Sequence, residues 1–342
     1  MRKLSVKIFI TLACALVIML LAVCLGSVTV SVRDTAAILA HKLLGRPLPE
    51  RITGTAVSII WTIRFPRVLL AFLVGAALGA SGTVMQSVLK NPLASSYTLG
   101  VSSGASLGAF VVMITGFSVL GSLTLPAAGL LCGMATVVLA VVLAARVDKG
   151  MKNNTIILTG MVFSLFVNAV LSLLSALYRE SVERLYLWQM GSFSLKDMSY
   201  VAILFPILCV GLVLLMAQSR ELDLLTFGEE QAMAMGVDTR RSKWLLLLTA
   251  AALTGSAVSL VGVIGFIDLI APHLTRRLFG AKHGVTLPMS ALIAGAFMAL
   301  CDLVARTVVS PSEIPVGAVS ALIGAPFFAY VYFRRGKETR HA

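Results

Sequence analysis

The stretch 66–87, PRVLLAFLVGAALGASGTVMQS, decides what kind of protein this chain forms. After Arg67 it contains no charged residue, and its length of about twenty residues is what a helix needs to cross a hydrocarbon core about 30 Å thick. Comparable apolar blocks recur along the chain at 8–30, 96–116, 122–145, 155–177, 200–217, 244–265, 286–305 and 315–333. The sequence therefore predicts an all-α, polytopic membrane protein.

The composition of the whole chain agrees with this prediction. Hydrophobic residues make up 58% of the 342 residues, charged residues only 13%, and the mean hydropathy is +0.96. These values exclude a soluble enzyme, a disordered chain and a disulfide scaffold. The net charge of +13 is explained by Lys and Arg in cytoplasmic loops, and we expect a lipid bilayer, not a nucleic acid, as the partner of the basic surface.

The number of crossings follows from the two ends of the chain. Both termini are basic, so both are expected in the cytoplasm, and the number of spans must be even. Nine blocks are clear, and the stretch 266–279, which contains Asp268 and Pro272, supplies a short, broken tenth span. We expect one domain over 1–342, divided into a first helix at 8–30, an external loop at 31–63, helices 2–6 at 64–217, a cytoplasmic loop at 218–243, helices 7–10 at 244–333 and a cytoplasmic tail at 334–342.

Two of the spans carry stripes of small residues. One consists of Gly75, Gly79 and Gly82, and the other of Gly100, Gly104 and Gly108. Small residues allow helix backbones to approach closely in lipid, where no hydrophobic force drives them together. The stripes predict close helix packing or the lining of a translocation path, and the sequence leaves both interpretations open.

The chain contains no motif typical of an enzyme. It has no phosphate-binding loop, its four histidines are dispersed, and its five cysteines stand singly in apolar blocks. We therefore expect no catalytic residue, no metal site and no cofactor bound by this chain. Any energy must come from an ion gradient or from another protein. Asp302 precedes Arg306 by four residues and predicts a local ion pair, whereas Asp268 keeps an ion-coupled carrier open as an alternative.

The loop 220–243 is the most informative polar segment. Within it, residues 228–236 read GEEQAMAMG, which predicts a short helix with an acidic start and a glycine stop. A solvated helix would not need the apolar side chains of Met233 and Met235. They favour docking into a groove of a partner protein over an ordinary solvated loop.

Several ordered motifs together resemble one protein family. They are RFPR at 64–67, GAALG at 75–79 followed by Gly82 and Gln86, NPLA at 91–94, LGV at 99–101, the 228–236 segment, DLVAR at 302–306, EIPVG at 313–317 and GAPF at 324–327. This series, from about residue 60 to 333, resembles the FecCD family, the permeases of iron-siderophore, haem and vitamin B12 ABC importers. The chain departs from the family pattern at Ser95-Ser96-Tyr97, where relatives often have proline, and at Asp268, where many have glycine.

The resemblance implies a type II ABC importer permease fold of ten helices. A second permease copy, identical or paralogous, would complete a central path. Two cytoplasmic ABC ATPase subunits would bind ATP and Mg²⁺, and an extracytoplasmic substrate-binding protein would deliver the substrate. In the family the segment at 228–236 is the helix that couples to the ATPase. This role would fall to Gly228, Glu229, Ala232, Met233, Met235 and Gly236.

The resemblance also implies a docking role for arginines. Residues that match Arg64 and Arg306 face outward and meet acidic residues of the binding protein in the vitamin B12 importers, and Arg67 could share the role. Anchoring at the membrane interface is the alternative. We expect a permease of the bacterial inner membrane that moves a ferric siderophore, with haem or vitamin B12 as alternatives. Two other classes stay open, an ion-gradient carrier that works alone and a scaffold or receptor that transports nothing.

Overall fold

A computed structural model describes residues 2–26, 28, 30–148 and 150–338. Seven spans in this part are long and apolar enough to cross a membrane. They are formed by α1 (Arg2–Cys24), α4 (Phe65–Val88), α6 (Thr124–Val147), α7 (Asn153–Leu177), α9 (Met198–Ala217), α12 (Thr239–Val261) and α14 (His283–Ala305). Three shorter or broken helices join them, namely α5 (Val101–Thr115), α13 (Ile267–Phe279) and α15 (Val316–Glu338). The described residues thus form the ten-helix bundle that the sequence predicts.

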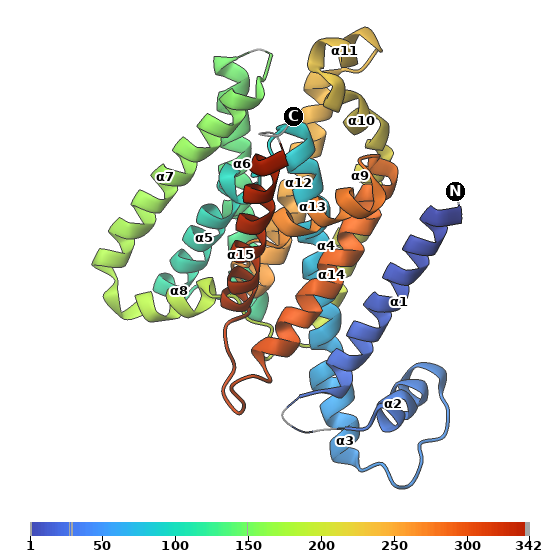
Figure 1. The fold of residues 1–342 in the computed structure, drawn as a ribbon. Helices are drawn as coiled ribbons and strands as arrows, with labels where there is room; N and C mark the ends of the chain where they lie inside the picture. Colours follow the sequence, from blue (N-terminus) through green and yellow to red (C-terminus); the bar gives the residue numbers. More distant parts are fainter. Residues whose placement is uncertain (1, 27, 29, 149, 339–342) are drawn as a thin grey trace.

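Short elements lie at the two ends of the bundle (Figure 1). One end carries α2 (Val32–Leu44), α3 (Gly54–Ser58), the π-helical η1 (Ile59–Arg64) and α8 (Val182–Gln189). The opposite end carries α10 (Ser219–Phe227) and α11 (Glu229–Ala234), and there α1 begins and α15 ends. Short 3₁₀ turns are η2 (Ser96–Leu99), η3 (Gly121–Leu123) and η4 (Arg179–Ser181). The stretch 31–63, expected as a loop, therefore contains two α-helices, and residues 339–342 of the expected tail lie outside the described residues.

Helix α4 forms the centre of the bundle, and its small residues explain why. It packs against α9, α12, α13 and α14 and is buried along nearly its whole length. A Cβ atom at Gly75 would lie 2.6 Å from the Cβ of Met298, and one at Gly79 would lie 2.5 Å from the carbonyl oxygen of Ser290, both on α14. The missing side chains let the two helix backbones touch, which is how helices associate in lipid.

The second small-residue stripe brings α5 against α6. A Cβ at Gly104 would lie 2.6 Å from the carbonyl oxygen of Cys132, and one at Gly108 would lie 2.9 Å from the Cβ of the same cysteine. Gly100 has a φ of 91° and precedes the first residue of α5, where the left-handed conformation favours glycine. This stripe therefore also serves helix packing.

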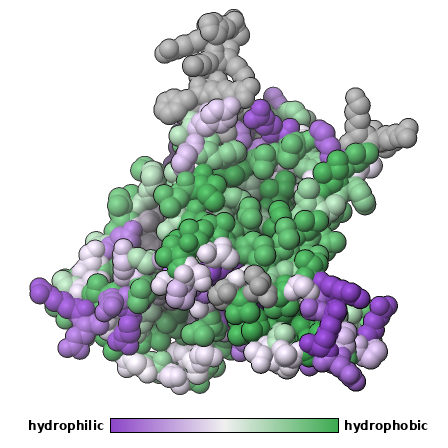
Figure 2. Space-filling model, turned by 60° about the horizontal axis from the view of Figure 1, so that its bottom comes forward, coloured by the Kyte–Doolittle hydropathy of each residue, from purple (hydrophilic) through white to green (hydrophobic). Residues whose placement is uncertain are grey.

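The outside of the bundle is apolar. Large hydrophobic side chains such as Leu165 and Phe166 on α7 are 69% and 65% exposed. Figure 2 shows hydrophobic residues over the middle of one face and hydrophilic residues gathered toward its edges. A surface of this kind is suited to lipid and not to water, so the chain is a multi-pass membrane protein.

The chain is interrupted between α12 and α13, as the broken tenth span predicts. Gly262 ends α12 with a φ of 87°, and Phe266 precedes α13 with a φ of 69°. Helix α13 has 13 residues, which at 1.5 Å per residue is about 20 Å and too short to cross a bilayer alone. It is enclosed by α4, α14 and α15, which satisfies the condition for irregular backbone at membrane depth.

Candidate functional site

The first candidate site is the α10–α11 segment, defined as residues 219–238. Helix α10 ends at Phe227, and Gly228 then turns the chain with a φ of 133° into the six residues of α11. Glu229 and Glu230 occupy the first turn of α11, where the helix dipole favours acidic residues, and Gly236 follows with a φ of 85°. Figure 1 shows α11 projecting beyond the end of α12. The predicted short helix is confirmed.

A buried lysine fixes this segment to the bundle. Lys243 on α12 is only 1% exposed. Its Nζ donates to Oε1 of Glu229 at 2.6 Å, to the carbonyl oxygen of Met151 at 2.8 Å and to Oδ1 of Asn153 at 3.0 Å. The three bonds join α12 to α11, to the loop before α7 and to the first residue of α7. The sequence did not predict this role, because nothing in the pattern distinguishes Lys243 from the other basic residues of the loop.

The loop that meets Lys243 is itself held by Asp148. Its carboxylate accepts hydrogen bonds from the backbone N–H of Lys152 at 3.0 Å and of Gly150 at 2.9 Å. These bonds favour the ionised carboxylate and lower the pKa of Asp148 below its ordinary value. The turn therefore presents the Met151 carbonyl to Lys243 in a fixed position.

The side chains of the α10–α11 segment divide into an inner and an outer set. Ala232 is fully buried, and Glu229 is turned toward Lys243. Both side chains face the bundle in this structure, and the coupling role expected of these two residues stays a prediction. Phe227, Met233 and Met235 form the outer set, with exposed fractions of 67%, 54% and 57%. These three are the large apolar side chains that the segment exposes.

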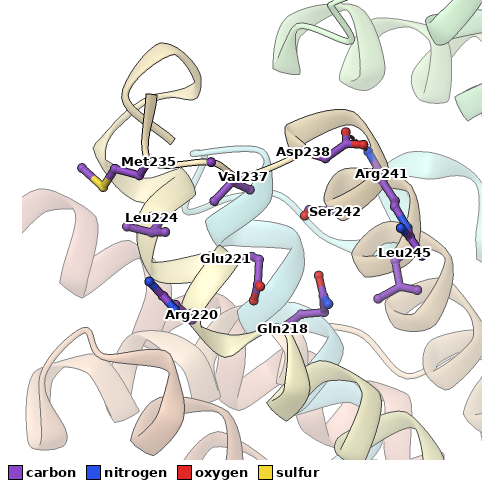
Figure 3. A pocket seen from close by; sticks show the side chains of 11 residues that line it. Gln218, Arg220, Glu221, Leu224, Met235, Val237, Asp238, Arg241, Ser242 and Leu245 are labelled. Carbon is purple, nitrogen blue, oxygen red and sulfur yellow. Dashed lines mark hydrogen bonds between the residues drawn. The ribbon is translucent and has the colours of Figure 1, made fainter. Parts of the chain in front are cut away.

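A groove of about 500 Å³ lies beside α11, between α10 and the start of α12 (Figure 3). It is lined by Gln218, Arg220, Glu221, Leu224, Met235, Gly236, Val237, Asp238, Arg241, Ser242 and Leu245. Asp238 is engaged as the cap of α12, since its Oδ1 accepts from the N–H of Arg241 at 3.0 Å. Oε2 of Glu221 is buried and has no hydrogen-bond partner among the residues that the structure describes.

The opposite end of the bundle holds an arginine cluster, defined as Arg64, Arg67, Arg306, Asp302 and Glu313. Arg67 is its centre. It donates to Oδ1 of Asp302 at 2.8 and 2.9 Å and to Oε1 and Oε2 of Glu313 at 2.7 and 3.1 Å. Asp302 also pairs with Arg306 at 3.4 Å, which confirms the predicted local ion pair. One fully buried carboxylate thus compensates two buried guanidinium groups.

Arg64 and Arg306 are buried within the described residues, and the docking role expected of them stays a prediction. Arg64 is 4% exposed and Arg306 is 7% exposed. Arg64 donates to the carbonyl oxygens of Val23, of Cys24 at 2.7 Å and of Val28, and Arg306 donates to that of Ala22. These acceptors lie at and just after the end of α1, where helix carbonyls have no helical donor. The arginines therefore cap α1, and Arg67 is buried as well.

Asp268 lies at the start of α13, beside Gly82 of α4. It is 1% exposed, Ser95 donates its hydroxyl to Oδ2, and Oδ1 has no hydrogen-bond partner within the described part of the chain. A Cβ at Gly82 would lie 2.7 Å from the carbonyl carbon of Asp268. Among the described residues, no group of three His, Cys, Asp or Glu side chains could hold a metal ion.

Comparison with known proteins agrees with this architecture. Residues 14–334 match the model of the FecCD transport family. A solved structure of an inward-facing metal-chelate type ABC transporter superposes with a TM-score of 0.83 at 30% identity, over 95% of this chain and 98% of the other. The bundle is therefore that of an ABC transporter permease subunit, which is not itself an enzyme.

Curated relatives point to the same class. An uncharacterised ABC transporter permease of Bacillus subtilis is 42% identical over 83% of this chain and 81% of its own length. The cobalamin import permease of Halobacterium salinarum is 40% identical over 86% and 78%, and the hemin transport permease of Yersinia pestis is 35% identical over 94% and 95%. The chain belongs to the FecCD transport family.

Proposed function

We propose that this chain is the membrane permease of an ATP-driven importer and that the α10–α11 segment receives the ATPase. The observation that carries this proposal is the outer set of Phe227, Met233 and Met235, which lies on the α10–α11 segment at the end of the apolar bundle. Apolar side chains exposed next to charges are typical of a docking surface. Lys243 fixes α11 to the bundle through Glu229, so a movement of the segment is transmitted to the bundle.

The proposed orientation places the α10–α11 segment and both termini in the cytoplasm. The arginine cluster then lies at the external end, where a substrate-binding protein would dock. Because its guanidinium groups are buried and those of Arg64 and Arg306 cap α1, we assign them to hold the shape of the docking face. A second permease copy, identical or paralogous, would enclose the path, and the apolar surface of α7 is available for contacts in the membrane plane.

The proposed substrate is a metal chelate, with a ferric siderophore as the first candidate. Relatives import hemin and cobalamin, and both molecules are metal chelates. The chemistry shared by these substrates supports the class, and the substrate-binding protein would set the choice within it. The system would work in the bacterial inner membrane.

The test is purification of the tagged chain in mild detergent, followed by mass spectrometry of the proteins that accompany it. We expect an ABC ATPase and a substrate-binding protein. Met233→Asp combined with Met235→Asp should remove the ATPase and leave the thermal stability of the chain unchanged. Leu195→Asp is the matched control, because Leu195 is 99% exposed in the loop before α9.

The competing class, an ion-gradient carrier, depends on the free carboxylate oxygen of Asp268. It predicts that the purified chain alone drives uptake in liposomes under a proton or sodium gradient and that Asp268→Asn abolishes this uptake. Uptake by the chain alone, with no ATPase accompanying it, would overturn the importer proposal.

A further inference from the structure

Helix α13 contains a proline whose missing hydrogen bond is supplied by another helix. Pro272 has no N–H, so the carbonyl of Asp268, four residues earlier, has no helical donor. Nε2 of Gln86 on α4 lies 3.3 Å from that carbonyl oxygen and 3.4 Å from the carbonyl oxygen of Leu269. Gly82, one turn before Gln86, allows the two backbones to approach. Helix α4 therefore replaces the donor that the proline removes.

The amide of Gln86 is held in this orientation by Arg276, one turn beyond Pro272 on α13. Nη1 of Arg276 donates to Oε1 of Gln86 at 2.5 Å, which turns Nε2 toward the carbonyl of Asp268. The second guanidinium nitrogen donates to Oγ of Ser87 at 3.2 Å. Arg276 thus joins the proline break to the next residue of α4.

From Ser87 the polar contacts continue to the α10–α11 segment. Nε2 of His283 lies 2.7 Å from Oγ of Ser87, and Nδ1 of His283 lies 2.6 Å from Oδ1 of Asp223 on α10. The backbone N–H of His283 donates to the same oxygen at 2.9 Å. A carboxylate only accepts, so Nδ1 donates to Asp223, and Nε2 of the neutral ring accepts from the Ser87 hydroxyl.

These contacts form one chain from α10 through α14 and α4 to α13. Ser87 and His283 are 7% and 2% exposed, and Gln86 is 4% exposed. A broken link would leave a buried polar group without a partner, which costs more than the bond itself contributes. The groups are therefore driven to move together, and a displacement of α10 reaches the N-terminal half of α13.

We propose that Gln86, Arg276 and His283 are positioning residues that transmit movement of the α10–α11 segment to the proline break of α13, where Asp268 lies. This inference depends on the proposed function, because it takes the ATPase as the source of the movement. It adds to that function the route by which the movement enters the bundle.

The test uses hydrogen–deuterium exchange of the permease in complex with its ATPase, in lipid nanodiscs, with and without ATP and vanadate. The nucleotide trap requires no knowledge of the substrate. Gln86→Leu and His283→Phe interrupt the chain at its two ends. Thr275→Val is the control, because the Thr275 hydroxyl donates to the carbonyl of Ala271 within α13 at 2.7 Å.

In the unmodified complex we expect trapping to change exchange in residues 219–236 and in residues 266–271. Both interrupting variants should keep the first change and lose the second, whereas Thr275→Val should keep both. Without nucleotide, Gln86→Leu should exchange about tenfold faster over 266–271, because a buried carbonyl has lost its donor. Combining the two variants should add nothing to either one, since both cut the same chain.

The outcomes separate the two proposals. Suppose that trapping changes hydrogen exchange at 219–236 and that it still changes exchange at 266–271 in both interrupting variants. The transmission route is then wrong and the proposed function stands. If no ATPase accompanies the unmodified chain, or trapping leaves 219–236 unchanged, the proposed function fails and the route fails with it. An additive loss in the double variant would indicate separate structural damage and overturn the single chain.

Discussion

Replacing Lys243 with methionine tests whether the α10–α11 segment is held by one buried charge. The substitution keeps an unbranched side chain of similar length but removes the Nζ that donates to Glu229, Met151 and Asn153. Removing one partner of a buried ion pair costs about 3–5 kcal/mol, because the other charge is left uncompensated. The Glu229 side chain is 27% exposed, so water can replace part of the lost interaction, and we expect a cost of about 2–3 kcal/mol.

The effect should be local and measurable by hydrogen exchange of the amides at 232–237. In the unmodified chain the N–H of Ala232 donates to Gly228 at 2.9 Å and that of Val237 donates to Ala232 at 3.0 Å. A cost of about 2–3 kcal/mol corresponds to local opening about 30- to 150-fold more often. Arg241→Met is the control, because Arg241 lies on the same helix with an exposed side chain, and it should leave these amides unchanged.

Lys243→Met combined with Glu229→Gln should recover much of the lost protection, since no uncompensated charge then remains. The expectation is refuted if the amides at 232–237 exchange in Lys243→Met at a rate within about twofold of that in the unmodified chain. It is also refuted if the double variant opens as often as the single one.

Three further substitutions test the packing and the arginine cluster by thermal unfolding in detergent. Gly82→Ala should destabilise the chain by about 2 kcal/mol or more, because the new Cβ overlaps Asp268. Gly129→Ala is the control, because its Cβ would meet Ser259 at 3.4 Å and be tolerated. Equal melting temperatures of the two variants would contradict this prediction. Arg64→Met should cost about 2 kcal/mol by removing the donor to carbonyls at the end of α1. A variant that melts normally but no longer binds the delivery protein would support the docking role. Asp302→Asn should cost about 3 kcal/mol and Glu313→Gln less than about 1 kcal/mol. The difference arises because the Asp302 side chain is fully buried and that of Glu313 is 38% exposed. The reverse order would show that Glu313 is the main partner of Arg67.

Local patterns were sufficient to predict the elements of the fold. The block 66–87 became the buried α4 because its composition is that of a membrane span, and its glycines became the contacts with α14 and α13. Residues 228–236 became α11 because an acidic first turn and a terminating glycine are local signals. Each of these predictions depends on residues within a few turns of one another.

Roles that depend on distant partners were predicted less well. The sequence did not predict that the end of α1, about forty residues before Arg64, accepts a hydrogen bond from the Arg64 guanidinium group. Lys243 and His283 carried no signal, because their partners belong to other helices. Gln86 lies within a motif of the family resemblance, but the motif does not show what its side chain binds. Gln86 donates to the carbonyl that Pro272 leaves without a helical donor, and the two residues meet only when α13 packs on α4.

The sequence alone determined that this protein is a helical membrane permease, where its spans lie and which short helix leaves the bundle. Hydrophobic length and small-residue spacing are properties of a single helix, so they can be read before the helices meet. The tertiary structure alone decided which buried charges compensate each other, which carbonyls the arginines cap and how α10 is joined to α13. Those contacts cross between elements as far as 284 residues apart, as Arg306 and Ala22 are, and only the packing of the bundle brings them together.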